Sequence, residues 1–179
     1  PIIFGSSKVV IKHIKLNEIK DFNFNIINKI EEAKSHKVNL LNIWDDDVEI
    51  KFGEATTVSG EKSFESIKKT AEALKEGKID VLVTAPINKA SIQAKVSSFI
   101  GHTEFLQGNF EGESLMLMVS ELMRIAFVTG HLPLTDVKKH ITDYNIFKKT
   151  QLLKTSLIQD FGIRKPKIAI LGLNPHAGE

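Results

Sequence analysis

Amine, amide and imidazole side chains follow three short apolar runs of this sequence, each directly after the run ends. Asn88 and Lys89 follow the first run, His131 the second and His176 the third. In open α/β sheets, ligands bind beyond the carboxyl ends of the strands, so these four side chains are candidates for a binding site. A further polar segment, 101–105, adds an imidazole, a hydroxyl and a carboxylate beside a glycine.

A divalent metal ion is the ligand that the two histidines favour. The chain has no cysteine, which excludes disulfides, thiolate metal sites and a cysteine nucleophile. Neutral imidazole is the commonest protein ligand for such ions, and His131 and His176 both lie at the ends of predicted strands. Two imidazoles do not close a coordination sphere, so a third ligand has to come from elsewhere.

Each candidate also has an ordinary structural interpretation. His131 and His176 could each hydrogen-bond a loop carbonyl, and Lys89 could be a surface lysine at the start of a helix. Thr103 could cap a helix that begins near His102. Taken one at a time, these interpretations are favoured. Taken together, the two strand-end histidines make a divalent-metal site at least as well supported as these ordinary interpretations.

Alternating helices and apolar strands must position these side chains. The alternation is typical of an α/β layer with a mostly parallel sheet. Before residue 62 the pattern is weaker, and the triplet 45–47 is predicted to be a solvated turn rather than a cation site. Strands are predicted at 2–5, 79–84, 115–119, 124–129 and 168–173, short strands or irregular edges at 9–14 and 48–52, and helices at 62–77 and 144–161, with 21–28 open between helix and loop.

Composition limits the function classes. The 179 residues are enough for one large domain or two small ones, and 42% of them are hydrophobic. A net charge of +2 excludes binding to nucleic acid through bulk charge. No apolar run reaches the length of a membrane span, and the first residues are not those of a signal peptide. We therefore expect a cytoplasmic protein that binds neither nucleic acid nor membrane.

Four motifs, taken together, identify a family. The segments Val83–Lys89, Gly101–Phe105, Thr129–Leu134 and Leu171–Glu179 closely resemble the 4-hydroxythreonine-4-phosphate dehydrogenase family of pyridoxal phosphate biosynthesis, in order and in separation. The resemblance implies a three-layer α/β/α fold like that of the isocitrate and isopropylmalate dehydrogenases. It implies parts of two α/β domains, with residues 1–90 in the first and 91–179 in the second.

The resemblance also implies residue roles. His102 and Thr103 match the family's substrate-binding pair, and His131 and His176 match two of the three histidines that hold a divalent metal such as zinc, magnesium or cobalt. The implied reaction is NAD- or NADP-dependent oxidation of 4-phosphooxy-L-threonine. The 3-oxo acid product then decarboxylates to 3-amino-2-oxopropyl phosphate. The family acts as a homodimer.

Several points stay open at this stage. Related dehydrogenases of threonate or erythronate 4-phosphate would carry the same motifs, and a metal-binding fragment without activity is a further alternative. No catalytic residue is assigned, and the absence of a G-x-G-x-x-G motif gives no support to a Rossmann-type cofactor site. The family's Gly/Pro-rich first motif and its third metal histidine have no counterpart here. We therefore expect a central piece of such an enzyme, inactive by itself.

Overall fold

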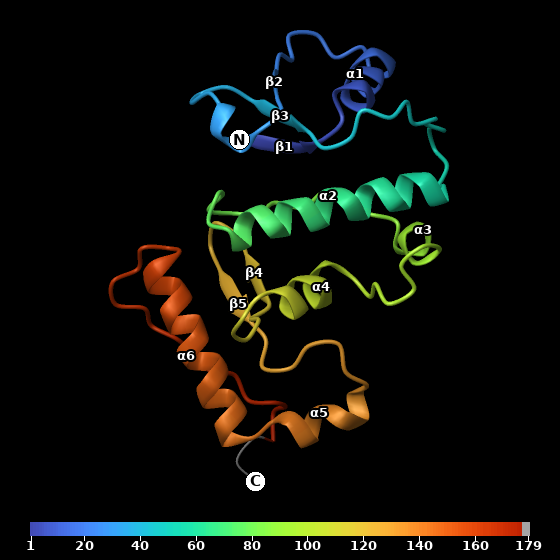
Figure 1. Ribbon diagram of the computed structural model, residues 1–179. Helices are drawn as coiled ribbons and strands as arrows, with labels where there is room; N and C mark the ends of the chain where they lie inside the picture. The colour runs from blue at the N-terminus through green and yellow to red at the C-terminus, as the bar shows by residue number, and fades with distance from the viewer. Residues whose placement is uncertain (177–179) are drawn as a thin grey trace. The chain divides into compact units, whose positions relative to one another are not determined.

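A three-stranded parallel sheet begins the chain. In the computed structural model, which describes residues 1–176, its strand order is β1-β3-β2, with β1 spanning Ile2–Gly5, β2 Asn25–Ile27 and β3 Asn39–Asn42 (Figure 1). Leu40 in the central strand is fully buried. The predicted strand 2–5 and the predicted α/β class with a parallel sheet are confirmed.

A buried asparagine fixes the start of this sheet. The Asn39 side chain is 2% exposed, and its amide donates to the backbone oxygens of Lys34 and Lys37 at 3.0 and 3.1 Å. Its Oδ1 accepts from the Lys34 backbone N–H at 2.9 Å. Because a buried amide is costly unless it is hydrogen-bonded, these bonds hold the turn before β3 in one conformation.

Helix α2, Thr57–Lys75, confirms the predicted helix at 62–77 and starts earlier. Thr56 is its N-cap, and the Thr56 and Ser59 side chains each accept from the other's backbone N–H at 3.1 Å, a reciprocal capping box. The sequence makes Ser59 or Ser63 the candidate cap, because the apolar periodicity begins only at Phe64; Ser59 belongs to the capping box, but the N-cap is Thr56.

The short helices α3, Lys89–Gln93, and α4, His102–Asn109, follow α2, and the core of this region lies around Ile67, Ile92 and Phe99. Phe64 of α2 packs edge-to-face against Phe99, with ring centroids 5.6 Å apart, and against Phe105 at 5.4 Å. Aromatic pairs in this geometry contribute beyond their buried area. This cluster attaches the segment after residue 88 to α2.

The chain divides into two compact units, Pro1–Gly112 and a second that begins at Glu113. This division differs from the expected boundary after residue 90, because α3 packs against α2 and so keeps residues 91–112 with the first unit. A 3₁₀ turn, η1, at Ile30–Glu32 also belongs to the first unit.

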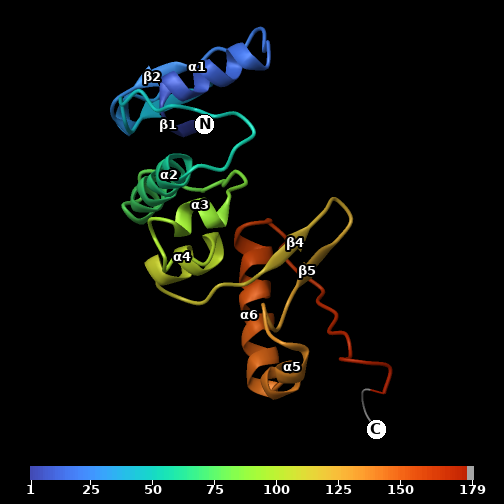
Figure 2. The ribbon, with the colours of Figure 1, turned by 90° about the vertical axis from the view of Figure 1, so that its right-hand side faces the viewer.

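The second unit contains an antiparallel strand pair and two helices. Strands β4, Leu117–Val119, and β5, Arg124–Ala126, confirm the strands predicted at 115–119 and 124–129, although their pairing is antiparallel. Helix α6, Asp143–Gln159, confirms the helix predicted at 144–161, and α5, Leu134–His140, precedes it (Figure 2). Glu113 joins this unit's start to α6 through ion pairs with Lys148 and Lys149 at 2.5 and 2.7 Å.

The prediction of a short strand or irregular edge at 9–14 is wrong. These residues lie in α1, Ser7–Leu16, with Ser6 at the N-cap. The Val and Ile side chains favour a strand by propensity, but that preference is weak against context. Lys12 of α1 reaches across to the 45–48 segment, where its Nζ pairs with Asp47 at 3.0 Å and donates to the Val48 carbonyl at 3.2 Å.

Other predictions before residue 62 have mixed outcomes. The segment 48–52 forms no strand, and the ambiguous segment 21–28 contains β2. Residues 45–47 form an exposed stretch, as expected, and two of its carboxylates pair with lysines.

None of the helices in the described part has the length and apolarity needed to cross a bilayer.

The apolar runs 79–84 and 168–173 are not strands, contrary to prediction. Both leave large apolar side chains exposed, including Val83 at 89% and Leu171 at 88%. A run of this kind becomes a strand only when a neighbour accepts and donates its backbone hydrogen bonds. Neither run has such a neighbour among residues 1–176.

Candidate functional site

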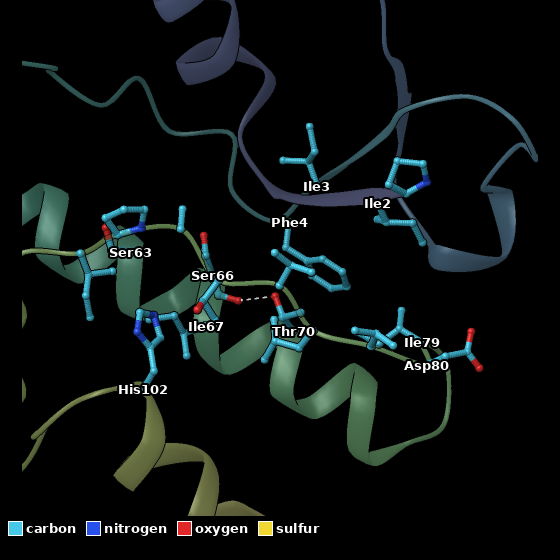
Figure 3. Close-up of a pocket in the computed structure, with 18 of the residues that line it drawn as sticks. Ile2, Ile3, Phe4, Ser63, Ser66, Ile67, Thr70, Ile79, Asp80 and His102 are labelled. Carbon is cyan, nitrogen blue, oxygen red and sulfur yellow. Dashed lines mark hydrogen bonds between the residues drawn. The ribbon is translucent and has the colours of Figure 1, made fainter. Parts of the chain in front are cut away.

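A cavity of about 790 Å³ lies in the first unit. Strand β1, one face of α2 and the extended segment 78–87 form its walls, and His102 lies at its border (Figure 3). Three hydroxyl-bearing side chains of α2 line it, from Ser63, Ser66 and Thr70. Their spacing of three and four residues places them on one helix face, and this pattern is visible in the sequence.

Two of these hydroxyls are already engaged. Thr70 donates to the backbone oxygen of Ser66 at 2.7 Å (Figure 3), and Ser63 donates to that of Ser59 at 2.7 Å. Such bonds to the preceding turn are common for hydroxyls inside helices. The remaining wall is mostly apolar, and His102 adds an imidazole at its border.

His102 is the first residue of α4, and its side chain is partly buried. Its Nε2 is buried and has no hydrogen-bond partner among the described residues. Burial lowers the pKa of the His102 imidazole, and the positive charge of Lys89 lowers it further. The ring is therefore held neutral and presents an unsatisfied nitrogen at the edge of the cavity, as expected for a group that awaits a ligand.

The start of α4 concentrates polar groups. Gly101 is the N-cap and offers no side chain to the first backbone N–H groups, so the interpretation of Thr103 as a cap is wrong. Thr103 is exposed in the first turn. A methyl group placed on Gly101 would lie 3.3 Å from Lys89 Nζ and 2.9 Å from Glu104 Oε2. An amine and a carboxylate thus flank this helix start.

Lys89 is the first residue of α3 and is exposed, which agrees with its interpretation as a surface lysine at a helix start. The preceding Asn88 is the cap, because its Oδ1 accepts from the Ser91 backbone N–H at 2.9 Å and from the Ser91 hydroxyl at 3.0 Å. Asn88 therefore has a structural role that orients Lys89 toward Gly101, and the lysine remains available to a ligand's negative charge.

The two candidate metal ligands lie in the second unit. His131 is exposed in the loop between β5 and α5. His176 is exposed and its backbone N–H donates to Asn174 Oδ1 at 3.0 Å, which confirms the turn expected at Asn174. Among residues 1–176, no group of three or more His, Cys, Asp or Glu side chains could hold an ion. The metal role of His131 and His176 stays a prediction, one that requires a ligand outside this set.

The coupling between Lys89 and His102 is testable by titration. Lys89→Met should raise the pKa of His102 toward 6.5 but leave it below, because burial, the larger cause, remains. In the unmodified protein the His102 pKa is lower in the folded than in the unfolded chain, so the unfolded chain binds more protons as the pH falls below 6.5. The contribution of His102 to stability is therefore present above pH 6.5 and is lost as the pH falls below that value. NMR titration of the imidazole measures the shift.

Lys95→Met is the matched control for this titration. Lys95 is exposed, and the same charge is removed there without changing the surroundings of His102. An unchanged His102 pKa in Lys89→Met, or an equal change in both variants, would contradict the electrostatic coupling.

Comparison with known proteins assigns the whole chain to one group. The family model described as "Pyridoxal phosphate biosynthetic protein PdxA" matches residues 1–179. The chain is 40% identical over 182 residues to a Bacteroides thetaiotaomicron protein named 4-hydroxythreonine-4-phosphate dehydrogenase, covering 100% of the chain and 50% of that protein. It is 34% identical over 188 residues to a Clostridium botulinum protein provisionally named D-threonate 4-phosphate dehydrogenase, covering 100% of the chain and 54% of that protein.

Solved structures with a similar fold carry the same enzyme name. A crystal structure of a 4-hydroxythreonine-4-phosphate dehydrogenase from Burkholderia phymatum superposes with a TM-score of 0.82 at 26% identity, over 99% of this chain and 54% of that one. The predicted dehydrogenase-like fold class is thereby confirmed. The chain spans about half the length of the curated relatives that it matches.

Proposed function

Because this chain belongs to the PdxA family of pyridoxal phosphate biosynthetic proteins, we propose that it carries the substrate-binding pair and two metal ligands of an NAD- or NADP-dependent dehydrogenase acting on 4-phosphooxy-L-threonine. The observation that carries the proposal is the buried, unpartnered Nε2 of His102 at the border of the 790 Å³ cavity. A homodimer that works in the cytoplasm is part of the same proposal.

Substrate binding falls to the start of α4. A phosphorylated, carboxylated substrate is anionic, and the uncapped N–H groups of the first turn, together with the Lys89 amine, provide donors for such a group. His102 Nε2 and the Thr103 hydroxyl add two side chains that can donate.

The donor set of the second unit fits a divalent metal. His131 and His176 lie on exposed loops and offer imidazole nitrogens, a ligand type that suits zinc, cobalt and magnesium to different degrees and adds no negative charge to the site. When bound, a divalent ion acidifies a substrate alcohol and polarises the ketone that follows, which favours both hydride loss and decarboxylation. The two histidines would hold it with a third ligand from outside the described residues. Hydride acceptance belongs to the nicotinamide cofactor.

A second substrate is favoured by one observation. The Clostridium botulinum relative carries the name of a D-threonate 4-phosphate dehydrogenase, and the match covers 100% of this chain. Threonate 4-phosphate has a hydroxyl where 4-phosphooxy-threonine has an amine. Both share the phosphate and the oxidised alcohol, so the groups at the start of α4 would serve either substrate.

The test uses a chimera in which this chain replaces the matching region of the Bacteroides thetaiotaomicron relative. With NAD⁺ or NADP⁺ and a divalent metal, the chimera should form NAD(P)H with 4-phosphooxy-L-threonine, with a higher kcat/KM than for D-threonate 4-phosphate. Absorbance at the nicotinamide band measures the rate.

The outcomes of this assay separate the alternatives. A preference for threonate or erythronate 4-phosphate would make that sugar acid phosphate the substrate in place of 4-phosphooxy-L-threonine. A chimera that is folded by circular dichroism and forms NAD(P)H with none of these substrates would contradict the dehydrogenase proposal. The unmodified relative is the positive control.

A further inference from the structure

A second cavity, of about 230 Å³, lies in the first unit between α1, the start of α2 and the segment that joins β3 to α2 (Figure 1). We call it the Trp44 cavity, after the indole that forms part of its wall. None of the residues assigned to the proposed substrate and metal sites lines it. Among its described lining residues, it shares only Ser63 and Ser66 of α2 with the 790 Å³ cavity. The proposed function leaves this cavity without a role.

The indole of Trp44 carries an unsatisfied donor at this wall. Its Nε1 is buried and has no hydrogen-bond partner among the described residues. An indole N–H can donate a hydrogen bond and cannot accept one. Because a buried donor without a partner is costly, native structures almost always place an acceptor beside it. We therefore expect the occupant of the Trp44 cavity to offer an acceptor to Nε1.

The ammonium group nearest to this indole is already neutralised. Lys62 Nζ lies 5.0 Å from the centre of the Trp44 ring, a cation–π contact that holds the ring in place. The same Nζ pairs with Asp46 at 3.3 Å and with Glu65 at 3.0 Å. Two carboxylates against one ammonium leave no net positive charge here for an anionic ligand.

The other polar side chains of the wall are engaged or exposed. Thr56 and Ser59 bond to each other in the capping box, and Ser63 donates to the Ser59 backbone oxygen at 2.7 Å. Glu49 and Lys51 are exposed and carry opposite charges. Trp44 Nε1 is thus the one buried side-chain polar atom of this wall that lacks a partner among the described residues.

Apolar side chains and the volume set the size and polarity of a ligand. Val9 of α1 lines the cavity together with Val48 and Ile50 of the segment between β3 and α2. An apolar cavity of about 150 Å³ holds one benzene molecule, so 230 Å³ accommodates one six-membered ring with a small substituent. Water alone fits less well, because an ordered water needs about two to four polar partners and these three side chains offer none.

We propose that the Trp44 cavity binds an uncharged small molecule with one ring, whose carbonyl oxygen or ring nitrogen accepts a hydrogen bond from Trp44 Nε1. The first turn of α2 also lines the cavity, and the positive end of its helix dipole favours the partial negative charge of such an atom. A carboxylate is disfavoured, because it would lose its hydration in exchange for a single uncharged donor. A cation is disfavoured by the nearby ammonium of Lys62.

Benzene and pyridine are the probe pair for this site, because they have the same shape and differ by one acceptor nitrogen. Benzoate is the anionic probe. Each is titrated into the chain above neutral pH, where pyridine is uncharged, and Kd is taken from the backbone amide shifts of Val48 and Ile50 in NMR spectra. The chain has one tryptophan, so its single indole N–H resonance reports the proposed contact directly. Trp44→Phe keeps an aromatic ring and removes the donor.

We expect pyridine to bind saturably to the unmodified chain and to shift the indole N–H resonance, and benzoate to bind at least about tenfold more weakly. In Trp44→Phe, the ratio of the pyridine Kd to the benzene Kd should rise about tenfold, because the acceptor is left unpaired while the lost ring volume affects both probes alike. An unchanged ratio, no saturable binding of pyridine, or benzoate binding as tight as that of pyridine would overturn the proposal.

A cavity-filling variant locates the binding. Val9→Phe fills the Trp44 cavity and should weaken the binding of benzene and pyridine at least about tenfold. Val58→Phe, the same substitution at an exposed position of α2 outside the cavity, should leave both Kd values within about twofold. Equal weakening in the two variants would place the binding elsewhere and overturn the proposal, and if Val9→Phe does not fold, the ratio in Trp44→Phe decides. None of these readouts requires enzyme activity, so this proposal and the proposed function can fail independently.

Discussion

Replacing His131 or His176 by alanine in the chimera is expected to lower metal-dependent turnover by about 10³-fold or more. Under the proposed function, each imidazole supplies one of three protein ligands. The described residues contain no group of three or more His, Cys, Asp or Glu side chains that could substitute. NAD(P)H formation is measured over a series of metal concentrations, because a weakened site regains part of its activity when the metal is in excess.

His140→Ala is the matched control for these variants. His140 is an exposed histidine at the end of α5, and its Nδ1 lies 3.0 Å from the backbone oxygen of Asp136. An exposed substitution of this kind should leave turnover within about twofold. Full activity in both His131→Ala and His176→Ala, or an equal loss in His140→Ala, would remove the ligand assignment.

Periodic segments were predictable because local sequence and packing agree in them. Phe64 and Ile67 recur at helical spacing and do pack into the first unit's core, so α2 forms where the sequence indicates it. Leu157 likewise is 6% exposed within α6. In these helices the apolar face has its partner within the same unit.

Segments whose partners lie far along the chain were not predictable. Residues 9–14 carry strand-favouring side chains, yet they lie in α1, which begins after Ser6. Conversely, 79–84 has the composition of a buried strand and is unpaired. Strand formation is a property of pairs, and one run's composition does not say whether its neighbour is present.

The candidate site likewise has features that the sequence predicts and others that depend on contacts between distant elements. The sequence pattern makes Lys89, at the end of an apolar run, and His102, in the polar segment 101–105, site candidates, and the structure places Lys89 close enough to lower the His102 pKa. Their proximity depends on α3 and α4 both being anchored to α2, through Ile92 and Phe105. Sequence spacing could not supply that anchoring, because it arises from contacts between elements.

Gly60→Ala is expected to destabilise the first unit by about 3 kcal/mol. Gly60 is buried in the second turn of α2, where a methyl group would overlap the backbone carbonyl of Ser91 and lie 2.6 Å from the Ile92 backbone nitrogen. Because these are backbone atoms, α3 has to move away from α2, which opens the core around Ile92. Urea unfolding followed by the fluorescence of Trp44, the one tryptophan, reports on this unit.

Gly108→Ala separates this contact from the general effect of glycine in helices. Gly108 lies in α4, and a methyl group there would meet nothing within 4 Å. Since alanine loses less backbone freedom on folding, this variant should gain about 0.5–1 kcal/mol. Opposite signs at the two positions would establish the close approach of α2 and α3, which fixes Lys89 relative to His102. A similar effect at both positions would mean that α3 is held there by something other than this contact.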